Sequence, residues 1–251
     1  MKNRTIKILY DMIDFAFLTV TNSPFVPVVE RLVTSLEQHH PDIPLYVVCV
    51  NMLEEEVEYI KGLHKNLKTI LVEKKFKKFG GQRELGPEDP DHEEGYCTSC
   101  RSWFMLDIME EENKSVFYLD ADVYLRGPIT KLFPSLQRAD FMVRSKDLNP
   151  KTFRCNAGMV WVKDTPSNRL LVSDWAQKTR DMGISWRSNQ WTLDQIIREN
   201  WNSIKYMDFP HEFNGKLNNP DTVLVHLKGP RKDEALKKFM DLSQRKGDGT
   251  A

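Results

Sequence analysis

Apolar runs of strand length alternate with amphipathic stretches through the first third of the chain. FAFLTVTN (15–22), PLYVVCVN (44–51) and LKTILVEKKF (67–76) predict buried strands, since β-branched and aromatic residues are frequent in them. Between these runs, apolar residues recur at steps of three and four after Ser23-Pro24 and again in LEEEVEYIKGL (53–63), which predicts two helices. The alternation indicates an α/β fold with a mostly parallel, mixed central sheet flanked by helices.

The rest of the chain continues this alternation. A charged, Gly- and Pro-rich connection at 77–95 is expected to be either a functional lid or a disordered loop. The pattern then predicts helices at about 96–112, 128–136, 167–181 and from about 190, and strands at 116–125, 139–145, 152–163 (buried from about Gly158), 203–209 and 222–229. A short charged helix and a frayed end are expected after Asp233. The 251 residues suffice for one large α/β domain and leave little room for a second, so a single domain is expected; no internal repeat is present.

Two carboxylates interrupt the most apolar part of this pattern. In VFYLDADVYL (116–125), Asp120 and Asp122 follow a buried run, and an isolated ionised carboxylate in such surroundings costs several kcal/mol. We therefore expect the strand to stop at Asp120, so that both carboxylates lie at its carboxyl end, where open α/β sheets bind ligands. Oxygen ligands of this kind suit Mg²⁺ or Mn²⁺ shared with nucleotide phosphates. A solvated turn or a helix N-cap is the alternative.

Charge and hydropathy exclude several functional classes. Lys+Arg and Asp+Glu both total 36, which gives a formal net charge of +0, so no global basic field attracts nucleic acid. Basic residues precede an apolar stretch near residue 15, but Asp11 and Asp14 interrupt it and no small-residue cleavage site follows, unlike a signal peptide. No stretch approaches the roughly 20 apolar residues of a transmembrane segment. A soluble, cytoplasmic protein is expected.

The four cysteines predict no disulfide framework in a chain of this length. Cys97 and Cys100 form a CxxC, but the second CxxC of a zinc site is absent. The pair shares helical spacing with Phe104 and Ile108, so thiols on a packed helix face are favoured over a thioredoxin-like role.

Four sequence blocks carry a resemblance to a known family. They follow a βαβαβ pattern that lacks both GxGxxG and GxxxxGKS, so neither a dinucleotide fingerprint nor a P-loop is present. The blocks are CRSWFMLDIMEEENKSVFYLDADVYLRGPI with Arg101 about twenty residues before Asp120, CNAGMVWVK, the Asp194-Gln195 pair, and HLKGPRK. Over about residues 15–232 the chain resembles nucleotide-sugar transferases of the glycosyltransferase-A fold, and more specifically glycosyltransferase family 8, which includes glycogenin and bacterial lipooligosaccharide galactosyltransferases. The resemblance implies a nucleotide-binding half at about 15–125 and an acceptor-side half at about 126–232.

The resemblance implies a metal and diphosphate site around the Asp120-Ala121-Asp122 segment. His226 would join the two aspartates around Mn²⁺ (or Mg²⁺), since an imidazole among carboxylates favours Mn²⁺. Gly229 would let the backbone approach the diphosphate, and Lys232 would place a cation on it. Arg101 would contact the diphosphate or the donor sugar, the alternative being an exposed helical arginine.

Further positions follow from the same resemblance. Asn156 is implied to contact a sugar hydroxyl, and Asp194 to accept hydrogen bonds from hydroxyls of the donor sugar. Gln195 is implied to lie beneath the anomeric carbon. For Asp194 and Gln195 the alternative is polarity near a helix N-terminus. The base is expected near three residues at the end of the first strand, namely Thr19, Thr21 and Asn22. Related enzymes often carry acidic residues there and this chain has Thr-Val-Thr, which leaves uracil and guanine both open.

Two tryptophans are candidates for the acceptor site. Trp186 and Trp191 flank amide side chains before Asp194, and flat indoles suit stacking on sugar faces, although core packing is the commoner fate of tryptophan.

The sequence thus predicts a metal-dependent glycosyltransferase that moves a hexose from a nucleotide diphosphate sugar, such as UDP-glucose or UDP-galactose, to a hydroxyl of a glycan, glycolipid or protein. The configuration at the anomeric carbon is expected to be retained, by front-face attack or by double displacement through Gln195 or Asp194. A nucleotidyltransferase and a catalytically silent nucleotide-sugar-binding protein are the alternatives. The oligomeric state is left open.

Overall fold

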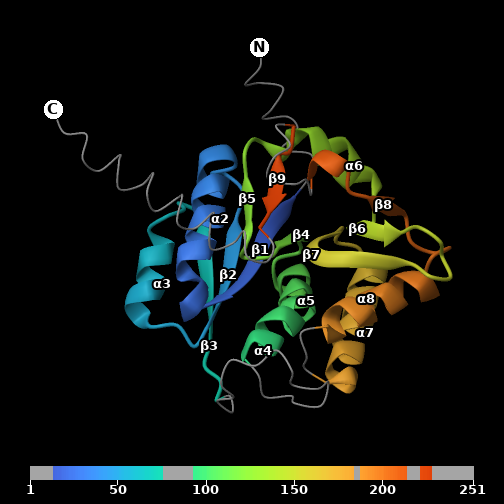
Figure 1. Cartoon of the computed structure of the whole chain (residues 1–251), viewed down its shortest axis with the longest axis horizontal. Helices are drawn as coiled ribbons and strands as arrows, with labels where there is room; N and C mark the ends of the chain where they lie inside the picture. Colours follow the sequence, from blue (N-terminus) through green and yellow to red (C-terminus); the bar gives the residue numbers. More distant parts are fainter. Residues whose placement is uncertain (1–13, 76–92, 184–186, 214–220, 228–251) are drawn as a thin grey trace.

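A seven-stranded mixed sheet forms the centre of the molecule (Figure 1). In this computed structural model the described residues are 14–75, 93–183, 187–213 and 221–227. The strand order is β3-β2-β1-β4-β7-β6-β8, where β1 pairs in parallel with β2 and β4, β2 with β3, and β6 with β8, while β7 is antiparallel to β4 and β6. The predicted mostly parallel, mixed sheet flanked by helices is confirmed.

The first half of the chain begins with three parallel strands, and the predicted first strand agrees with the observed one at both ends. The elements are β1 (Phe15–Asn22), the 3₁₀ turn η1 (Ser23–Phe25), α2 (Val26–His39), β2 (Leu45–Val50), α3 (Glu54–Lys61), β3 (Leu67–Val72), α4 (Glu93–Ser99), α5 (Arg101–Glu111) and β4 (Ser115–Leu119). The single helix predicted at 96–112 is wrong in one respect, because the chain breaks at Cys100 into α4 and α5.

The second half of the chain adds the remaining strands, three α-helices and two 3₁₀ helices. They are β5 (Val123–Leu125), η2 (Ile129–Leu132), α6 (Phe133–Arg138), β6 (Phe141–Asp147), β7 (Arg154–Val162), α7 (Pro166–Met182), α8 (Ser188–Glu199), β8 (Tyr206–Asp208), η3 (His211–Phe213) and β9 (Leu224–His226). β5 and β9 form a separate two-stranded sheet. The strand predicted at 116–125 is therefore two strands in two sheets.

Apolar side chains fill both faces of the central sheet. Alternation along β1 sends Phe15 and Phe17 into a core shared with α2 and α6, and Leu18 and Val20 into a core shared with α5, α7 and α8. Figure 1 shows α2 and α3 near one end of the sheet and α5, α7 and α8 beneath the other. Within the described ranges, no helix combines the length and apolar character needed to cross a bilayer.

Candidate active site

The Asp120–Asp122 turn lies at the carboxyl end of β4. As predicted, β4 stops at Leu119, and the chain re-enters a strand only at Val123. The turn is closed by two backbone hydrogen bonds: Val123 N donates to Asp120 O at 3.0 Å, and Asp120 N donates to Gly158 O at 2.8 Å. The two carboxylate side chains are 25% and 17% exposed, so both lie at the surface edge of the sheet rather than inside it. Ligands of open α/β sheets bind at this edge.

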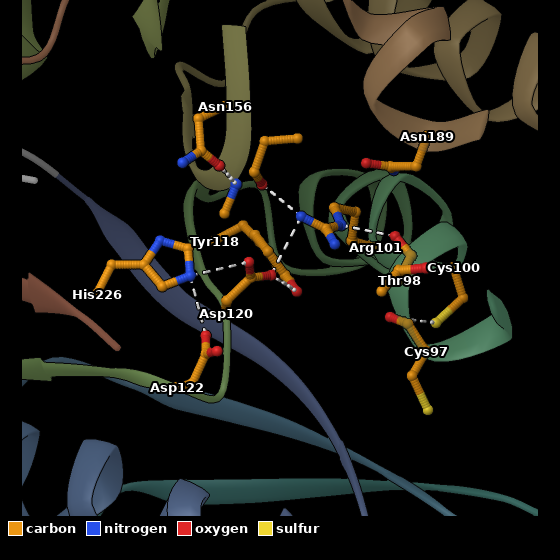
Figure 2. Close-up of polar contacts among 12 residues, drawn as sticks. Cys97, Thr98, Cys100, Arg101, Tyr118, Asp120, Asp122, Asn156, Asn189 and His226 are labelled. Atoms are coloured by element: carbon orange, nitrogen blue, oxygen red, sulfur yellow. Dashed lines mark hydrogen bonds and ion pairs between the residues drawn. The ribbon is translucent and has the colours of Figure 1, made fainter. Parts of the chain in front are cut away.

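His226 reaches the same turn from β9. β9 pairs antiparallel with β5 so that His226 lies opposite Val123, and Leu227 N donates to Asp122 O at 2.9 Å. His226 Nε2 is then 3.0 Å from Asp122 Oδ1 and 3.7 Å from Asp120 Oδ2 (Figure 2). Among the described residues, these three form the one cluster with metal-binding geometry, and their ligand atoms lie within 4.8 Å of one another.

Gly158 on β7 packs directly against this cluster. A Cβ at this position would lie 2.5 Å from Asp120 Oδ2 and 2.5 Å from His226 Cε1, closer than side chains tolerate. A glycine within a strand often marks a close approach of other groups, and here two site side chains make that approach. Any larger residue would separate the aspartate from the histidine.

The donor set fits a divalent cation. Two carboxylates and one imidazole combine hard oxygen ligands with a nitrogen ligand, as Mn²⁺ accepts and, with less preference for nitrogen, Mg²⁺. The His226 side chain is only 8% exposed, and its Nδ1 has no hydrogen-bond partner among the described residues. Nε2, which faces both carboxylates, is therefore the ligand atom that the geometry offers. A cation there would also relieve the repulsion between the two carboxylates.

Arg101 lies behind the turn, inside the protein. Its guanidinium is 3.2 Å from Asp120 Oδ1, donates to Ala157 O and to Thr98 O (2.7 Å), and stacks over the Tyr118 ring with Cζ 4.5 Å from the centroid (Figure 2). Burial opposes the charge of Arg101, but Tyr118 and Asp120 outweigh it and the pKa of Arg101 lies above its usual value. The exposed-arginine alternative is excluded, because only 5% of Arg101 is exposed. Its contacts orient Asp120.

Tyr118 completes the support of Asp120. Its hydroxyl donates to Asp120 Oδ1 at 2.8 Å, and burial raises the pKa of the phenol well above its usual value. A neutral phenol and a charged guanidinium therefore hold one oxygen of Asp120, while the other oxygen faces His226.

Asn156 lies near the cluster on β7. Its Oδ1 accepts a hydrogen bond from Gly158 N at 3.0 Å, and the side chain is partly exposed. In the view of Figure 2, Asn156 lies above His226 and Asp120. The bond stiffens the segment that carries Gly158, and the amide nitrogen is oriented away from that bond.

The predicted Asp194-Gln195 pair does not open a helix. α8 begins at Ser188, so Asp194 is its seventh residue. Asp194 is 5% exposed and its Oδ1 accepts from Cys155 N at 2.8 Å; burial raises the pKa of this carboxyl in spite of that bond. Gln195 instead donates to Glu199 Oε1 at 2.7 Å and lines a surface groove. Polarity near a helix N-terminus, the alternative for this pair, is therefore excluded.

The first turn of α8 carries a polar pair that the sequence reasoning did not select. Asn189 is 1% exposed, and its Nδ2 is buried without a hydrogen-bond partner among the described residues. Figure 2 shows Asn189 on the opposite side of Arg101 from His226. An unsatisfied buried amide costs about 1–3 kcal/mol, which favours a ligand partner. The signal in the sequence was the polar run Ser188-Asn189-Gln190 at the helix start.

The residues predicted to surround the base lie at the end of β1. Thr19, Thr21 and Asn22 are all buried, and β1 neighbours β4, so their strand end borders the Asp120 turn. Asn22 Nδ2 donates to Glu93 Oε1 at 2.6 Å, and Asn51 Nδ2 donates to Glu93 Oε2 at 3.2 Å. An acidic residue from α4 thus reaches the strand end that lacks one of its own.

Four predicted site residues remain to be placed. Trp191 lies on α8 and is 45% exposed, which excludes the core-packing alternative for it. Trp186, Gly229 and Lys232 lie outside the described residues, as do most of the 77–95 connection and the tail after Asp233.

The four cysteines form no disulfide. Cys100 lies fully buried at the break between α4 and α5, where burial raises the pKa of its thiol well above the usual value, and Cys97 packs partly against the same core. A protonated, buried thiol supports the packing role rather than redox catalysis.

Comparisons with known proteins agree with this geometry. A family model described as nucleotide-diphospho-sugar transferase matches residues 71–240, more than half of the chain. A structure of the galactosyltransferase LgtC in complex with donor and acceptor sugar analogs is 15% identical, with a TM-score of 0.57 over 92% of this chain and 96% of that one. The glycosyltransferase GlyE of Streptococcus pneumoniae TIGR4 is 15% identical, with a TM-score of 0.55 over 92% of this chain and 64% of that one.

A third structural neighbour, mouse xyloside xylosyltransferase 1, is 14% identical, with a TM-score of 0.52 over 85% of this chain and 97% of that one. No curated protein matched the chain. At such identities the structural likeness shows the fold, and the family model shows the family. The chain has the glycosyltransferase-A fold, resembles glycosyltransferase family 8, and belongs to the nucleotide-diphospho-sugar transferases.

Proposed function

We propose that this chain is a metal-dependent, retaining hexosyltransferase that takes a hexose from a UDP-sugar, such as UDP-glucose or UDP-galactose, and passes it to a hydroxyl of a glycan, glycolipid or protein. The observation that carries the proposal is the convergence of Asp120, Asp122 and His226 on one turn at the carboxyl edge of the sheet. That edge is where the fold binds nucleotides.

Asp120, Asp122 and His226 would hold Mn²⁺ or Mg²⁺, which when bound supplies Lewis-acid stabilisation of the departing diphosphate. Arg101 and Tyr118 fix one oxygen of Asp120 and leave the other facing His226. Gly158 leaves the space in which the carboxylate and the imidazole meet. Lys232 would add a cation to the same leaving group, and Gly229 would admit the diphosphate to the backbone.

Donor orientation is assigned to the start of α8 and to β7. In LgtC, a glutamine-to-glutamate variant is described as an active-site mutant, so a glutamine lies at the active site of that protein. This chain offers Gln190 in the first turn of α8 and Gln195 near its end. We assign the role to Asn189 and Gln190, because Asn189 has a buried amide without a partner, while Asp194 is bonded to Cys155 and Gln195 to Glu199. Asn156 remains a candidate contact of the donor sugar.

The base and acceptor are assigned to the two sides of this edge. Thr19, Thr21 and Asn22 would border the base, and Ala121 in the aspartate turn would lie against the donor. Trp191, with nearly half of its surface exposed, suits stacking on an acceptor sugar, and Trp186 extends the same segment.

The test combines binding with turnover. Calorimetry with UDP should show affinity that depends on Mn²⁺, and UDP-glucose or UDP-galactose should be hydrolysed slowly in the absence of an acceptor. Proton NMR of the transferred sugar would report the anomeric configuration. Equal turnover in EDTA and in Mn²⁺ contradicts the metal, an inverted product contradicts retention, and binding of UDP without turnover of either sugar indicates a silent protein.

A further inference from the structure

A surface groove follows the far end of α8, away from the Asp120 turn. It has a volume of about 870 Å³, in the range of small-ligand sites. Its walls come from the connection between β6 and β7 and from the last turn of α8 with the residues after it, and they include Lys151, Gln195, Arg198, Glu199, Trp201 and Asn202. We call it the α8 groove.

Charge in the α8 groove is unbalanced in favour of cations. Glu199, its one acid, is already engaged: Oε1 accepts from Gln195 at 2.7 Å and Oε2 lies 3.4 Å from Lys178 Nζ. Lys151 and Arg198 are both exposed, and neither forms an ion pair or a side-chain hydrogen bond with a described residue. Two exposed cations therefore line a groove whose one carboxylate is paired with Lys178, although Arg198 also lies in the field of Asp194.

Trp201 gives the groove a rigid aromatic wall. Its ring lies 5.5 Å from the Phe153 ring and 5.3 Å from the Tyr206 ring, so the indole is held in one orientation while part of it lines the groove. The indole N–H makes no hydrogen bond to any described residue. A fixed aromatic surface with a free donor, beside the amides of Gln195 and Asn202, suits the apolar face and the hydroxyls of a sugar ring.

α8 links the groove to the proposed active site. Asn189 lies in the first turn of the helix, and Arg198 follows nine residues later, which is about 14 Å along the axis. β7 makes the same connection, since Cys155 is bonded to α8 through Asp194 while Gly158 contacts Asp120. A chain of several sugars, with one hydroxyl at the active site, could span this distance.

From these observations we infer that the α8 groove binds an acidic sugar unit of the acceptor, remote from the hydroxyl that reacts. That the bound saccharide is the acceptor rests on the proposed transferase function. The preference of the groove for an anionic saccharide does not depend on that function. Lys151 and Arg198 would bind the acidic group, and Arg198 would donate two parallel hydrogen bonds to it. Trp201 would pack against the sugar ring.

Two matched probes test the inference without donor or metal. Tetragalacturonate and its fully methyl-esterified form share the same sugar chain, and esterification removes the charge of each carboxyl group while adding one methyl group to it. In two-dimensional NMR of the full chain, tetragalacturonate should shift the indole N–H signal of Trp201, which the variant Trp201→Phe identifies by its loss, and the ester should bind at least about tenfold more weakly. Equal affinity for acid and ester, or binding that leaves the Trp201 signal unmoved, overturns the inference.

Charge variants locate the binding. The double variant Lys151→Gln/Arg198→Gln should weaken tetragalacturonate binding at least about tenfold at low salt, while Lys61→Gln/Lys131→Gln, which removes two exposed cations on α3 and η2, should leave it unchanged. Equal loss in both double variants means non-specific attraction and refutes the site. Asp122→Ala separates the two proposals, because it should remove hexosyl transfer but keep tetragalacturonate binding. The transferase proposal and the groove proposal can therefore each be refuted without the other.

Discussion

The Asp120–Asp122 turn and the helix α8 both carry polar residues next to buried ones, yet only at the turn does the sequence leave a single candidate pair. At the turn, two carboxylates end an apolar strand, and no alternative pair lies nearby. α8 offers two similar pairs, Asn189-Gln190 and Asp194-Gln195, five residues apart. Five residues turn a helix by about 140°, so the two pairs point in different directions. Polar residues that interrupt a buried strand therefore indicate a functional site more clearly than polar residues on a half-exposed helix do.

The largest expected effect comes from breaking the turn. Asp122→Ala should lower hexosyl transfer by at least about 10³-fold, because a metal contributes several kcal/mol of transition-state stabilisation and each 1.36 kcal/mol is tenfold in rate. Mn²⁺ affinity, measured by calorimetry, should fall with it, while circular dichroism stays that of the wild type. The surface variant Asp42→Ala, whose partner is Lys65, serves as the control. Full activity of Asp122→Ala in EDTA would refute the metal site.

The next prediction tests whether metal binding at the turn requires the space that Gly158 leaves as well as the three ligand side chains. Gly158→Ala puts a Cβ 2.5 Å from Asp120 Oδ2 and His226 Cε1, so the two ligands must separate. Mn²⁺ affinity should fall by about 10–100-fold, as it does when groups supporting metal ligands are disturbed. Gly127→Ala is the matched control, since a Cβ there meets nothing within 4 Å. Similar Mn²⁺ affinities for the two variants would mean that the crowding at Gly158 does not matter.

On α8, the two polar pairs can be compared directly. Asn189→Ala should lower kcat/KM for UDP-sugar turnover by about tenfold, since it removes a buried amide proposed to bond the donor. Gln195→Ala should cost less, because Gln195 bonds Glu199 at the surface. Gln177→Ala, an exposed glutamine on α7, controls for loss of an amide as such. A larger loss for Gln195→Ala than for Asn189→Ala would restore the original assignment.

Most of the fold and the two aspartates of the turn could be predicted because they depend on local pattern, whereas His226 followed only from the family resemblance. β1 matches its predicted range of 15–22, and β4 stops where the carboxylates begin. The break at Cys100 could not be predicted, since neither Gly nor Pro marks it and the helical spacing continues through it. The bond between Asn22 and Glu93 joins residues 71 positions apart, and the crowding at Gly158 depends on three separate strands. Such contacts arise from packing between elements, which periodicity does not contain.

The smallest expected effect concerns Asp194, a buried carboxyl whose Oδ1 accepts a hydrogen bond from Cys155 N. Burial raises the pKa of Asp194 above its usual value, so the folded state binds its proton more tightly than the unfolded state does. The stabilisation from the protonated form is therefore complete below about pH 4 and is lost as the pH rises through the raised pKa. Asp194→Asn keeps an oxygen that accepts from Cys155 N and removes the charge. The Tm of the variant minus the Tm of the wild type should therefore increase by a few degrees from pH 4 to pH 7.

Asp147 provides the opposite control. Bonds from Thr152 and Asn149 lower the pKa of Asp147, so Asp147→Asn should lose stability relative to wild type at neutral pH and recover it in acid. Differences between wild type and variant, measured by thermal melts at each pH, cancel the titration of the other carboxylates. If Asp194→Asn shows the same slope as Asp147→Asn, the fold does not raise the pKa of Asp194, and the account of this carboxyl as one destabilised by burial is wrong.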